Sequence, residues 1–403
     1  MDQEAVVKDR RLETKKKTMN AKILITGIVV YIVSAVVSFL IFSGLSGPSA
    51  VPVTAPKKTA SGGLMFDDSL PKTESCPING AKYSKQQRAW WEKHEPLGVM
   101  IENHTEARPQ SGISFADVVY EAIAEGGITR FLTVFYCQDA DVVGPVRSAR
   151  TYFIDFLSEY GSFPLYAHVG GANSDGQADA LGQLETYGWA GVNDLNQFSI
   201  GFPVFLRDYD RLGRTVATEH TMYSSTTKLW DYAAKSRKIT NVNPDGEKWD
   251  KDFVPYTFKE DAALSTRPAA QTVSYDFWDG YGDFSVLWNY DKTTNSYLRT
   301  NGGKPHLDLD TKKQLTAKNV IVLFMKESRA NDGYEGNLHM LYGTKGTGNA
   351  KVFMDGVETD ATWSKKSRTA HLYLKDKRGQ DIELNRGKIW FSIVSPTTDV
   401  TVK

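Results

Sequence analysis

One uncharged run constrains this chain more than any other feature of its sequence. It extends from Ile23 to Phe42 and consists mostly of apolar residues. As a helix with a rise of about 1.5 Å per residue, a run of this length spans roughly 30 Å, the thickness of the hydrocarbon core of a bilayer. Within lipid, a single segment satisfies all its backbone groups only as a helix. We therefore predict a transmembrane helix over residues 23–42.

The charges on either side predict the orientation of this helix. Residues 1–22 contain seven Lys and Arg residues against four Asp and Glu residues, whereas the first cations after the helix are Lys57 and Lys58. Because Lys and Arg are retained on the cytoplasmic side, we expect a single-pass protein of the cell membrane. Residues 1–22 would then form a basic cytoplasmic tail, and the domains that follow would be extracytoplasmic. A cleavable signal peptide is the alternative, but its apolar region is normally only about 7–15 residues long.

Composition limits what the exterior part can be. Residues 43–80 are rich in Gly, Ser, Pro and Ala, a composition that predicts a flexible stalk. Aromatic residues make up 12% of the whole chain, which is too many for a disordered protein. Lys and Arg number 48, as do Asp and Glu, so the formal net charge is zero. We therefore expect folded domains and no nucleic-acid partner.

The cysteines and histidines limit which disulfide, metal and cofactor sites this chain can form. Cys76 and Cys137 are the two cysteines, so a disulfide-rich scaffold and a site built from several cysteines are excluded. Both follow the predicted helix, where an oxidising exterior permits a disulfide between them; two separate buried thiols are the alternative. The seven histidines show no His-x-x-x-His spacing, and no Gly-rich phosphate loop is present. We predict no metal and no cofactor.

Two regions of the exterior part differ in their pattern of strand-like and helix-like runs. Residues 81–240 alternate strand-like and helix-like runs, whereas residues 270–397 contain strand-like runs separated by Gly, Asn and Asp turns. Alternating elements favour a layered α/β domain, and successive hairpins favour an antiparallel sheet. We predict a mixed α/β fold, with an N-terminal α/β domain over 81–240, an exposed connector over 241–269 and a β-rich C-terminal domain over 270–397.

A β-hairpin is predicted early in the first domain. The pair Gly126–Gly127 supplies a two-residue turn between two strand-like arms. In the register that we expect, Ile123 lies opposite Arg130, and Glu121 and Glu125 flank it diagonally on the same face. Arg130 then has a structural role as their counter-ion.

A ligand site is predicted at one edge of the sheet. The loops after the strands 130–136 and 164–169 are expected to leave from the same carboxyl edge, where such sheets bind ligands. A helix beginning at Pro145 would carry Arg147 and Arg150 in its first two turns. Cations are disfavoured at a helix N-terminus, so the pair points to a compensating anion, either a ligand or a protein carboxylate. The candidate ligand-binding residues are Arg147, Arg150, Asn173 and Arg108.

Three residues are candidates for acid/base chemistry. His168 ends a predicted strand, and His220 precedes a capped helix. Both rings have an unperturbed pKa near neutrality, which suits proton transfer. Glu121 is the third candidate. For the histidines, the alternative is a hydrogen-bonded residue of the interior.

Two segments resemble a known family. Residues 107–136 (ARPQSGISFADVVYEAIAEGGITRFLTVFY) and 143–150 (VGPVRSAR) are similar to the DUF3048 family, the YerB-like lipoproteins of bacteria. The ending LNRGKIWFSIV carries the resemblance in the second domain. It implies an extracytoplasmic, membrane-attached protein with a layered α/β fold, and it implies no particular reaction. The recurring positions of the family correspond here to Arg108, Glu121, Glu125, Gly126, Gly127, Arg130, Arg147, Arg150, His168 and His220.

Three functions are compatible with these features. The first is a membrane-tethered protein that binds an anionic or polyhydroxylated component of the cell envelope at the Arg147/Arg150 edge. The second is an envelope hydrolase or transferase that uses Glu121 or His168 as acid/base. The third is a structural module that binds other proteins through its C-terminal sheet. A concave pocket around the arginines would favour the first two over the third.

Overall fold

A computed structural model describes residues 20–39, 54–59, 63–173, 176–336 and 338–403. The chain divides into two compact units, residues 1–53 and 54–403. In the first unit, the described residues form one helix, Asn20–Phe39, which is long and apolar enough to cross a membrane. By length and composition, a signal sequence would pass the same test. Residues 40–42 of the predicted span lie outside the described residues.

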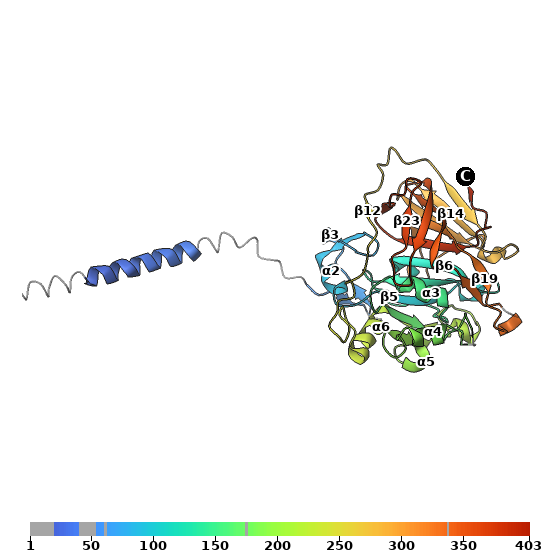
Figure 1. The fold of residues 1–403 in the computed structure, drawn as a ribbon, viewed down its shortest axis with the longest axis horizontal. Helices are drawn as coiled ribbons and strands as arrows, with labels where there is room; N and C mark the ends of the chain where they lie inside the picture. Colours follow the sequence, from blue (N-terminus) through green and yellow to red (C-terminus); the bar gives the residue numbers. More distant parts are fainter. Residues whose placement is uncertain (1–19, 40–53, 60–62, 174–175, 337) are drawn as a thin grey trace, which may run out of the picture. The chain divides into compact units, whose positions relative to one another are not determined.

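The second unit is built on a ten-stranded sheet that contains strands from both halves of the chain (Figure 1). Strand β25 lies between β18 and β6 and runs parallel to both. The predicted C-terminal sheet therefore continues into the N-terminal strands. In spatial order the strands are β23 (Tyr373–Lys375), β22 (Val357–Lys365), β21 (Gly346–Met354), β18 (Asn319–Phe324), β25 (Ile389–Val394), β6 (Val118–Glu125), β7 (Ile128–Phe135), β5 (Leu97–Glu102), β8 (Leu165–His168) and β9 (Asp194–Asn196).

A second sheet of six strands covers one face of the first. Trp288 of this sheet contacts Trp390 of β25, with ring centroids 5.3 Å apart. On the opposite face, Tyr120 of β6 stacks on Phe156 of a helix at 4.9 Å. The central strands are thus covered on both sides, which explains why they read as continuous apolar runs. The six strands are β13 (Thr272–Tyr275), β14 (Val286–Asp291), β15 (Ser296–Asn301), β16 (Lys304–Pro305), β17 (Thr316–Ala317) and β26 (Thr401–Val402).

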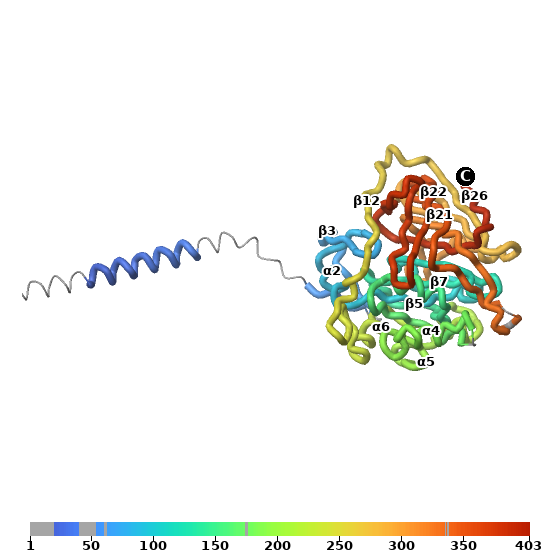
Figure 2. The backbone as a smooth tube through the Cα atoms, viewed as in Figure 1, coloured from blue at the N-terminus to red at the C-terminus, as the bar shows by residue number. Residues whose placement is uncertain are grey.

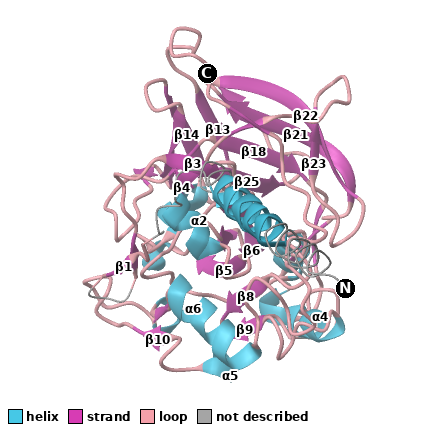
Figure 3. Cartoon of the chain, turned by 90° about the vertical axis from the view of Figure 1, so that its left-hand side faces the viewer, coloured by secondary structure: helices cyan, strands magenta, loops and turns pink. Residues whose placement is uncertain are grey.

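The helices are short, and several lie at one end of this unit. Figure 3 shows α4, α5 and α6 near β8 and β9, away from β13, β14, β21 and β22. The Ser225 side chain caps α6, the capped helix expected after His220, by accepting a hydrogen bond from the backbone of Lys228. The helices are α2 (Lys85–Trp91), α3 (Thr151–Leu157), α4 (Ala180–Thr186), α5 (Gln197–Ile200) and α6 (Thr226–Tyr232).

Part of the predicted stalk belongs to the folded unit. Residues 63–80 contain strands β2 and β3, and Cys76 is joined to Cys137 by a disulfide, one of the two alternatives for these cysteines. The stalk prediction over 43–80 is therefore wrong for this stretch, because a covalent bond and strand pairing hold it. The short pairs are β1 (Lys57–Lys58) with β2 (Leu64–Met65), β3 (Lys72–Ser75) with β4 (Lys82–Ser84), β10 (Leu206–Arg207) with β11 (Met222–Tyr223), β12 (Phe258–Lys259) with β24 (Leu384–Asn385), and β19 (Glu327–Arg329) with β20 (Met340–Tyr342).

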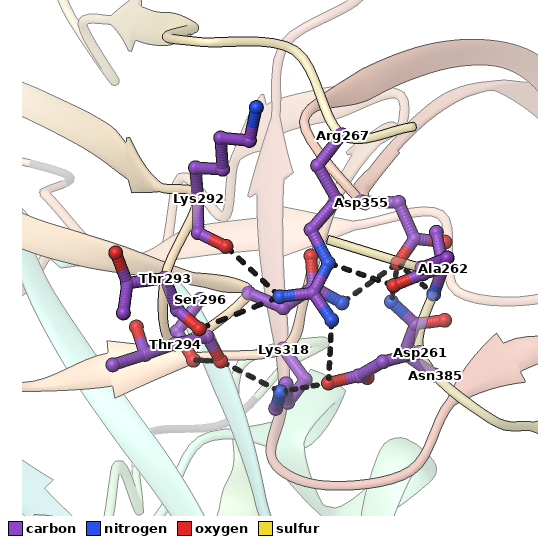
Figure 4. Close-up of polar contacts among 12 residues, drawn as sticks. Asp261, Ala262, Arg267, Lys292, Thr293, Thr294, Ser296, Lys318, Asp355 and Asn385 are labelled. Carbon is purple, nitrogen blue, oxygen red and sulfur yellow. Dashed lines mark hydrogen bonds and ion pairs between the residues drawn. The ribbon is translucent and has the colours of Figure 1, made fainter. Parts of the chain in front are cut away.

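The connector between the two regions runs along the outside of the unit, as the yellow segment through β12 in Figure 2 shows. Polar contacts hold its second part in place (Figure 4). Asp261 accepts a hydrogen bond from Lys318 at 2.5 Å, and Arg267 donates one to the carbonyl oxygen of Lys292 at 2.9 Å. The expected exposed connector over 241–269 is therefore attached to the β-rich region rather than free.

Candidate functional site

The segment that carries the two arginines is extended, not helical. Val146 forms a β-bridge with Ile101, and Ala149 forms one with Gly171. Helix α3 begins only at Thr151. The prediction of a helix from Pro145 is wrong because the backbone groups of this segment are satisfied by neighbouring strand ends, and apolar spacing alone does not separate a buried extended segment from a helix.

This segment, rather than two parallel strands, brings Arg147 to the sheet edge. Strand β7 is antiparallel to β5, whereas β8 is parallel to β5, so the carboxyl ends of β7 and β8 lie at opposite edges. The predicted shared edge for these two strands is therefore wrong. After β7 the chain returns across the sheet, and the backbone of Val169 donates a hydrogen bond to the carbonyl oxygen of Arg147 at 3.0 Å.

A pocket of about 420 Å³ lies at this edge. Arg147 is 23% exposed there, and its Nε lies 3.2 Å from a carboxylate oxygen of Glu102. Within the described part of the chain, its two terminal nitrogens donate no hydrogen bond. Burial lowers the pKa of Arg147, which means that its charged form would gain from a further anion. The pocket is also lined by Arg207, Glu219, Phe198, Gly170, Gly171 and Asn173.

Phe198, Arg207 and Glu219 were not predicted as site residues. Phe198 is 75% exposed on the four-residue helix α5, and Arg207 ends the two-residue strand β10. Neither element has a periodic pattern in the sequence, and both reach the pocket only through the tertiary fold.

Arg150 lies in the interior instead of in the pocket. Its side chain is 6% exposed and forms an ion pair with Glu125. The other oxygen of Glu125 accepts a hydrogen bond from Arg130 at 2.8 Å. One carboxylate thus compensates two guanidinium groups. This geometry corresponds to the structural alternative for Arg150 and not to a ligand-binding role.

A bulge in the hairpin decides which carboxylate meets Arg130. Arg130 pairs with Ala122, so the predicted register is wrong by one residue. Because residues directly opposite each other share a face, Glu121 and Arg130 lie on opposite faces. The register shifts before Glu125 and returns its side chain to the face of Arg130. The hairpin itself and its turn at Gly126–Gly127 are confirmed.

Glu121 is enclosed between the two sheets. It and Arg299 of β15 are both 0% exposed and form an ion pair at 2.9 Å. Thr129 and Trp390 also donate hydrogen bonds to its carboxylate, at 3.0 and 3.2 Å. Burial raises the pKa of Glu121, and the Arg299 charge opposes this. A carboxylate without exposure cannot reach a substrate, so this geometry contradicts the acid/base role predicted for Glu121.

His168 is likewise enclosed. One ring nitrogen lies 2.7 Å from the carbonyl oxygen of Gly170, and the other lies 2.6 Å from the carboxylate of Asp194. The side chain is 0% exposed. Because both ring nitrogens have partners, His168 orients the Gly170 turn beside the pocket. It corresponds to the alternative for the histidines, a hydrogen-bonded residue of the interior.

His220 lies behind Arg147. Glu102 joins the two: one carboxylate oxygen is 2.8 Å from Nδ1 of His220, and the other faces Arg147. The ring of His104 stacks on His220 at 4.9 Å. The hydrogen bond to Glu102 raises the pKa of His220 above its ordinary value. His220 therefore supports the carboxylate that holds Arg147.

The raised pKa of His220 predicts a pH-dependent stability. Its folded-state pKa lies above the unfolded value of about 6.5, so the stabilisation is complete below that pH and is lost as the pH rises through the folded-state pKa. We expect His220→Gln to destabilise the protein more at about pH 5.5 than at about pH 8.5 in urea unfolding. Glu102→Gln should remove the same pH dependence. A destabilisation by His220→Gln that is equal at both pH values would contradict this assignment.

Arg108 does not line the pocket around Arg147. Its guanidinium donates to the backbone and side-chain oxygens of Asn103 and, at 2.8 Å, to the carbonyl oxygen of Asp283. It lines a different pocket, between the two halves of the unit. The predicted set of Arg147, Arg150, Asn173 and Arg108 is therefore divided: Arg147 and Asn173 share one pocket, and Arg108 lies in another.

Comparison with known proteins agrees with this fold. The family model described as the N-terminal domain of DUF3048, a protein of unknown function, matches residues 82–240, and the C-terminal model matches residues 273–391. YerB of Bacillus subtilis (strain 168), whose name describes it as a candidate lipoprotein, is 29% identical over 335 residues, which cover 81% of this chain and 89% of YerB. A crystal structure of YerB from Bacillus subtilis, 24% identical, matches with a TM-score of 0.64 over 82% of this chain and 100% of that one.

The comparisons confirm two predictions. The mixed α/β fold is that of the solved YerB structure. The family resemblance extends over both of the regions that the sequence predicts, the α/β region and the β-rich region. Because the two family models together span more than half of its residues, the chain belongs to the DUF3048 family.

Proposed function

We propose that this chain is a membrane-anchored, extracytoplasmic protein of the bacterial cell envelope that binds an anionic, polyhydroxylated envelope component in the pocket around Arg147. The observation that carries the proposal is Arg147 itself. It is a largely buried cation whose terminal nitrogens donate no hydrogen bond within the described part of the chain, and it lines a pocket of about 420 Å³.

The N-terminal helix and the relative support the proposed anchor. YerB is named as a candidate lipoprotein, and such a protein is held at the membrane by its lipid. Here the apolar helix Asn20–Phe39, preceded by basic residues, would hold the chain at the membrane instead. The same charge asymmetry orients the second unit outward, and a disulfide between Cys76 and Cys137 suits an oxidising exterior.

The chemistry of the pocket indicates the class of ligand. Arg147 and Arg207 offer guanidinium groups, which hold carboxylates and phosphates by paired charge-assisted hydrogen bonds. Glu219 offers acceptors for hydroxyl groups. Phe198 presents an exposed aromatic face to the apolar side of a ring. A sugar unit that carries a carboxylate or a phosphate would contact the guanidinium groups, the acceptors of Glu219 and the ring of Phe198.

Cosedimentation of the full-length protein in detergent with purified bacterial cell walls tests this proposal. We expect Arg147→Gln to weaken binding about tenfold or more, because one charge-assisted hydrogen bond contributes roughly 1.5–3 kcal/mol. Phe198→Ala should also weaken it, and Phe202→Ala is the matched control. Phe202 is 83% exposed and does not line the pocket.

Walls with and without their anionic polymers separate the two kinds of envelope ligand. Loss of binding after removal of these polymers would identify them as the ligand, and retained binding would identify the glycan. Equal binding by wild type, Arg147→Gln and Phe198→Ala to both preparations would refute the pocket as the binding site.

A further inference from the structure

A second pocket, of about 360 Å³, lies between the two halves of the folded unit. Arg108 and Arg214 line it from the N-terminal half, and Lys304 and Asn301 line it from the C-terminal half. Its described lining residues carry three cations against one carboxylate, that of Asp283. A concave site at such a junction with an excess of positive charge is suited to an anionic ligand.

The three cations are held in different ways. Arg108 lies over the ring of Phe284 at 4.9 Å, and its guanidinium is fixed by Asn103. Arg214 donates hydrogen bonds to the carbonyl oxygens of Glu106 and Arg108, at 2.7 and 3.1 Å. Lys304 is exposed on β16, and its ammonium group has no hydrogen-bond or ion-pair partner among the described residues. The pocket thus combines rigid donors with one flexible cation.

The turn after β15 is shaped to admit Arg108. Gly302 has a positive φ of 57°, and a Cβ atom there would lie 2.5 Å from the carbonyl oxygen of Asp283 and 3.2 Å from a terminal nitrogen of Arg108. A side chain at this position would clash with the Asp283 backbone, and the guanidinium group would have to shift by a few tenths of an ångström. The backbone comes this close only because Gly302 has no Cβ.

A chain of hydrogen bonds leads to Asn301, one of the residues that line this pocket. The Glu121 carboxylate accepts from the hydroxyl of Thr129, which therefore accepts from the amide nitrogen of Asn103 at 2.7 Å. The amide oxygen of Asn103 in turn accepts from the amide nitrogen of Asn301 at 2.8 Å. The oxygen of Asn301 is left without a partner, although this residue is only 3% exposed. A buried acceptor without a donor is unfavourable and is satisfied by a ligand that brings one.

We propose that the pocket formed by Arg108, Arg214, Lys304 and Asn301 binds an oxyanion that retains an O–H group, of which hydrogen phosphate is the simplest example. The anionic oxygens accept from the three cations, and the O–H group donates to the oxygen of Asn301. Sulfate has the same shape but carries no proton near neutral pH. The site therefore discriminates between the two by one hydrogen bond, because an unpaired buried acceptor would remain with sulfate.

Isothermal titration calorimetry of the full-length protein in detergent, with inorganic phosphate and then with sulfate near pH 7, tests this proposal. We expect phosphate to bind about tenfold more tightly than sulfate. The double variant Arg214→Gln/Lys304→Gln changes only exposed side chains and should weaken phosphate binding by at least about tenfold. Gly302→Ala should also weaken it by shifting Arg108.

Lys235→Gln is the matched control, since Lys235 is an exposed cation that lines neither pocket. It should leave phosphate binding unchanged. Loss of binding in Arg207→Gln, which removes one cation from the Arg147 pocket, with retention in the double variant would assign the anion to the Arg147 pocket and overturn this proposal. Equal affinity for sulfate and phosphate would overturn the role of Asn301, and no measurable phosphate binding would overturn the site itself. The last two outcomes, equal affinity for both anions and no measurable phosphate binding, do not bear on cell-wall binding through Arg147 and Phe198.

Discussion

A fragment that ends at residue 254 is expected to remain unfolded, although it contains the whole region 82–240 matched by the N-terminal family model. Without β25, the largely apolar strand β6, which is buried over residues 118–124, would become an exposed edge of the sheet. The Glu121 carboxylate would also lose Arg299 and Trp390, which come from the other half. An apolar edge of this length promotes aggregation rather than folding.

Circular dichroism and urea unfolding of the fragment 54–254 check this expectation. Mixing it with the fragment 255–403 should restore a cooperative transition, because the shared sheet would re-form. As a control, a protease site inserted after residue 254 in the full-length chain should leave the cleaved protein folded, since residues 254 and 255 lie in neither a helix nor a strand. A cooperative transition of the fragment 54–254 alone would show that the two halves are independent domains.

Replacing Arg299 by Met is expected to lower the free energy of unfolding by about 3–5 kcal/mol, because it leaves the Glu121 carboxylate buried without its counter-ion. Both side chains are 0% exposed, so water cannot replace the lost partner. The rings of Trp390 and Trp288 enclose the guanidinium group at 4.6 and 5.3 Å. The hydrogen bonds that remain to Glu121 come from neutral donors.

The double variant Glu121→Leu/Arg299→Met separates the loss of a charge partner from the loss of packing. It should be considerably more stable than the sum of the two single variants predicts, because neither buried charge remains. Lys235→Met removes a partner from the exposed pair of Lys235 and Asp231 and should change stability by less than about 0.5 kcal/mol. A cost below about 1 kcal/mol for Arg299→Met would mean that Glu121 is protonated or hydrated in the folded protein.

Local patterns predict the strands and turns of this chain well. The hairpin turning at Gly126–Gly127 and the capped helix after His220 both form as expected. Each depends on interactions within a few residues, such as a turn that needs positive φ or a side chain that caps the nearest backbone N–H. Such interactions are encoded in the neighbouring sequence.

The candidate site was predicted less well, for a physical reason. Apolar spacing around Val146 is compatible with a helix, but the partners that keep this segment extended, such as Met100 and Gly171, are distant in sequence. The bulge before Glu125 moves one carboxylate to the other face of the sheet. Neither effect is visible in the local pattern.

By itself, the sequence determined the apolar span near the N-terminus, the mixed α/β class and the family, because hydrophobic length, residue texture and extended motifs are properties of the chain as written. Tertiary structure alone decided that β25 joins the two halves in one sheet and that Glu121 meets Arg299. It also placed Arg147 and Arg108 in separate pockets. The reason is that each of these outcomes depends on which distant strand satisfies an open edge or a buried charge, and that choice is made only when the whole sheet assembles.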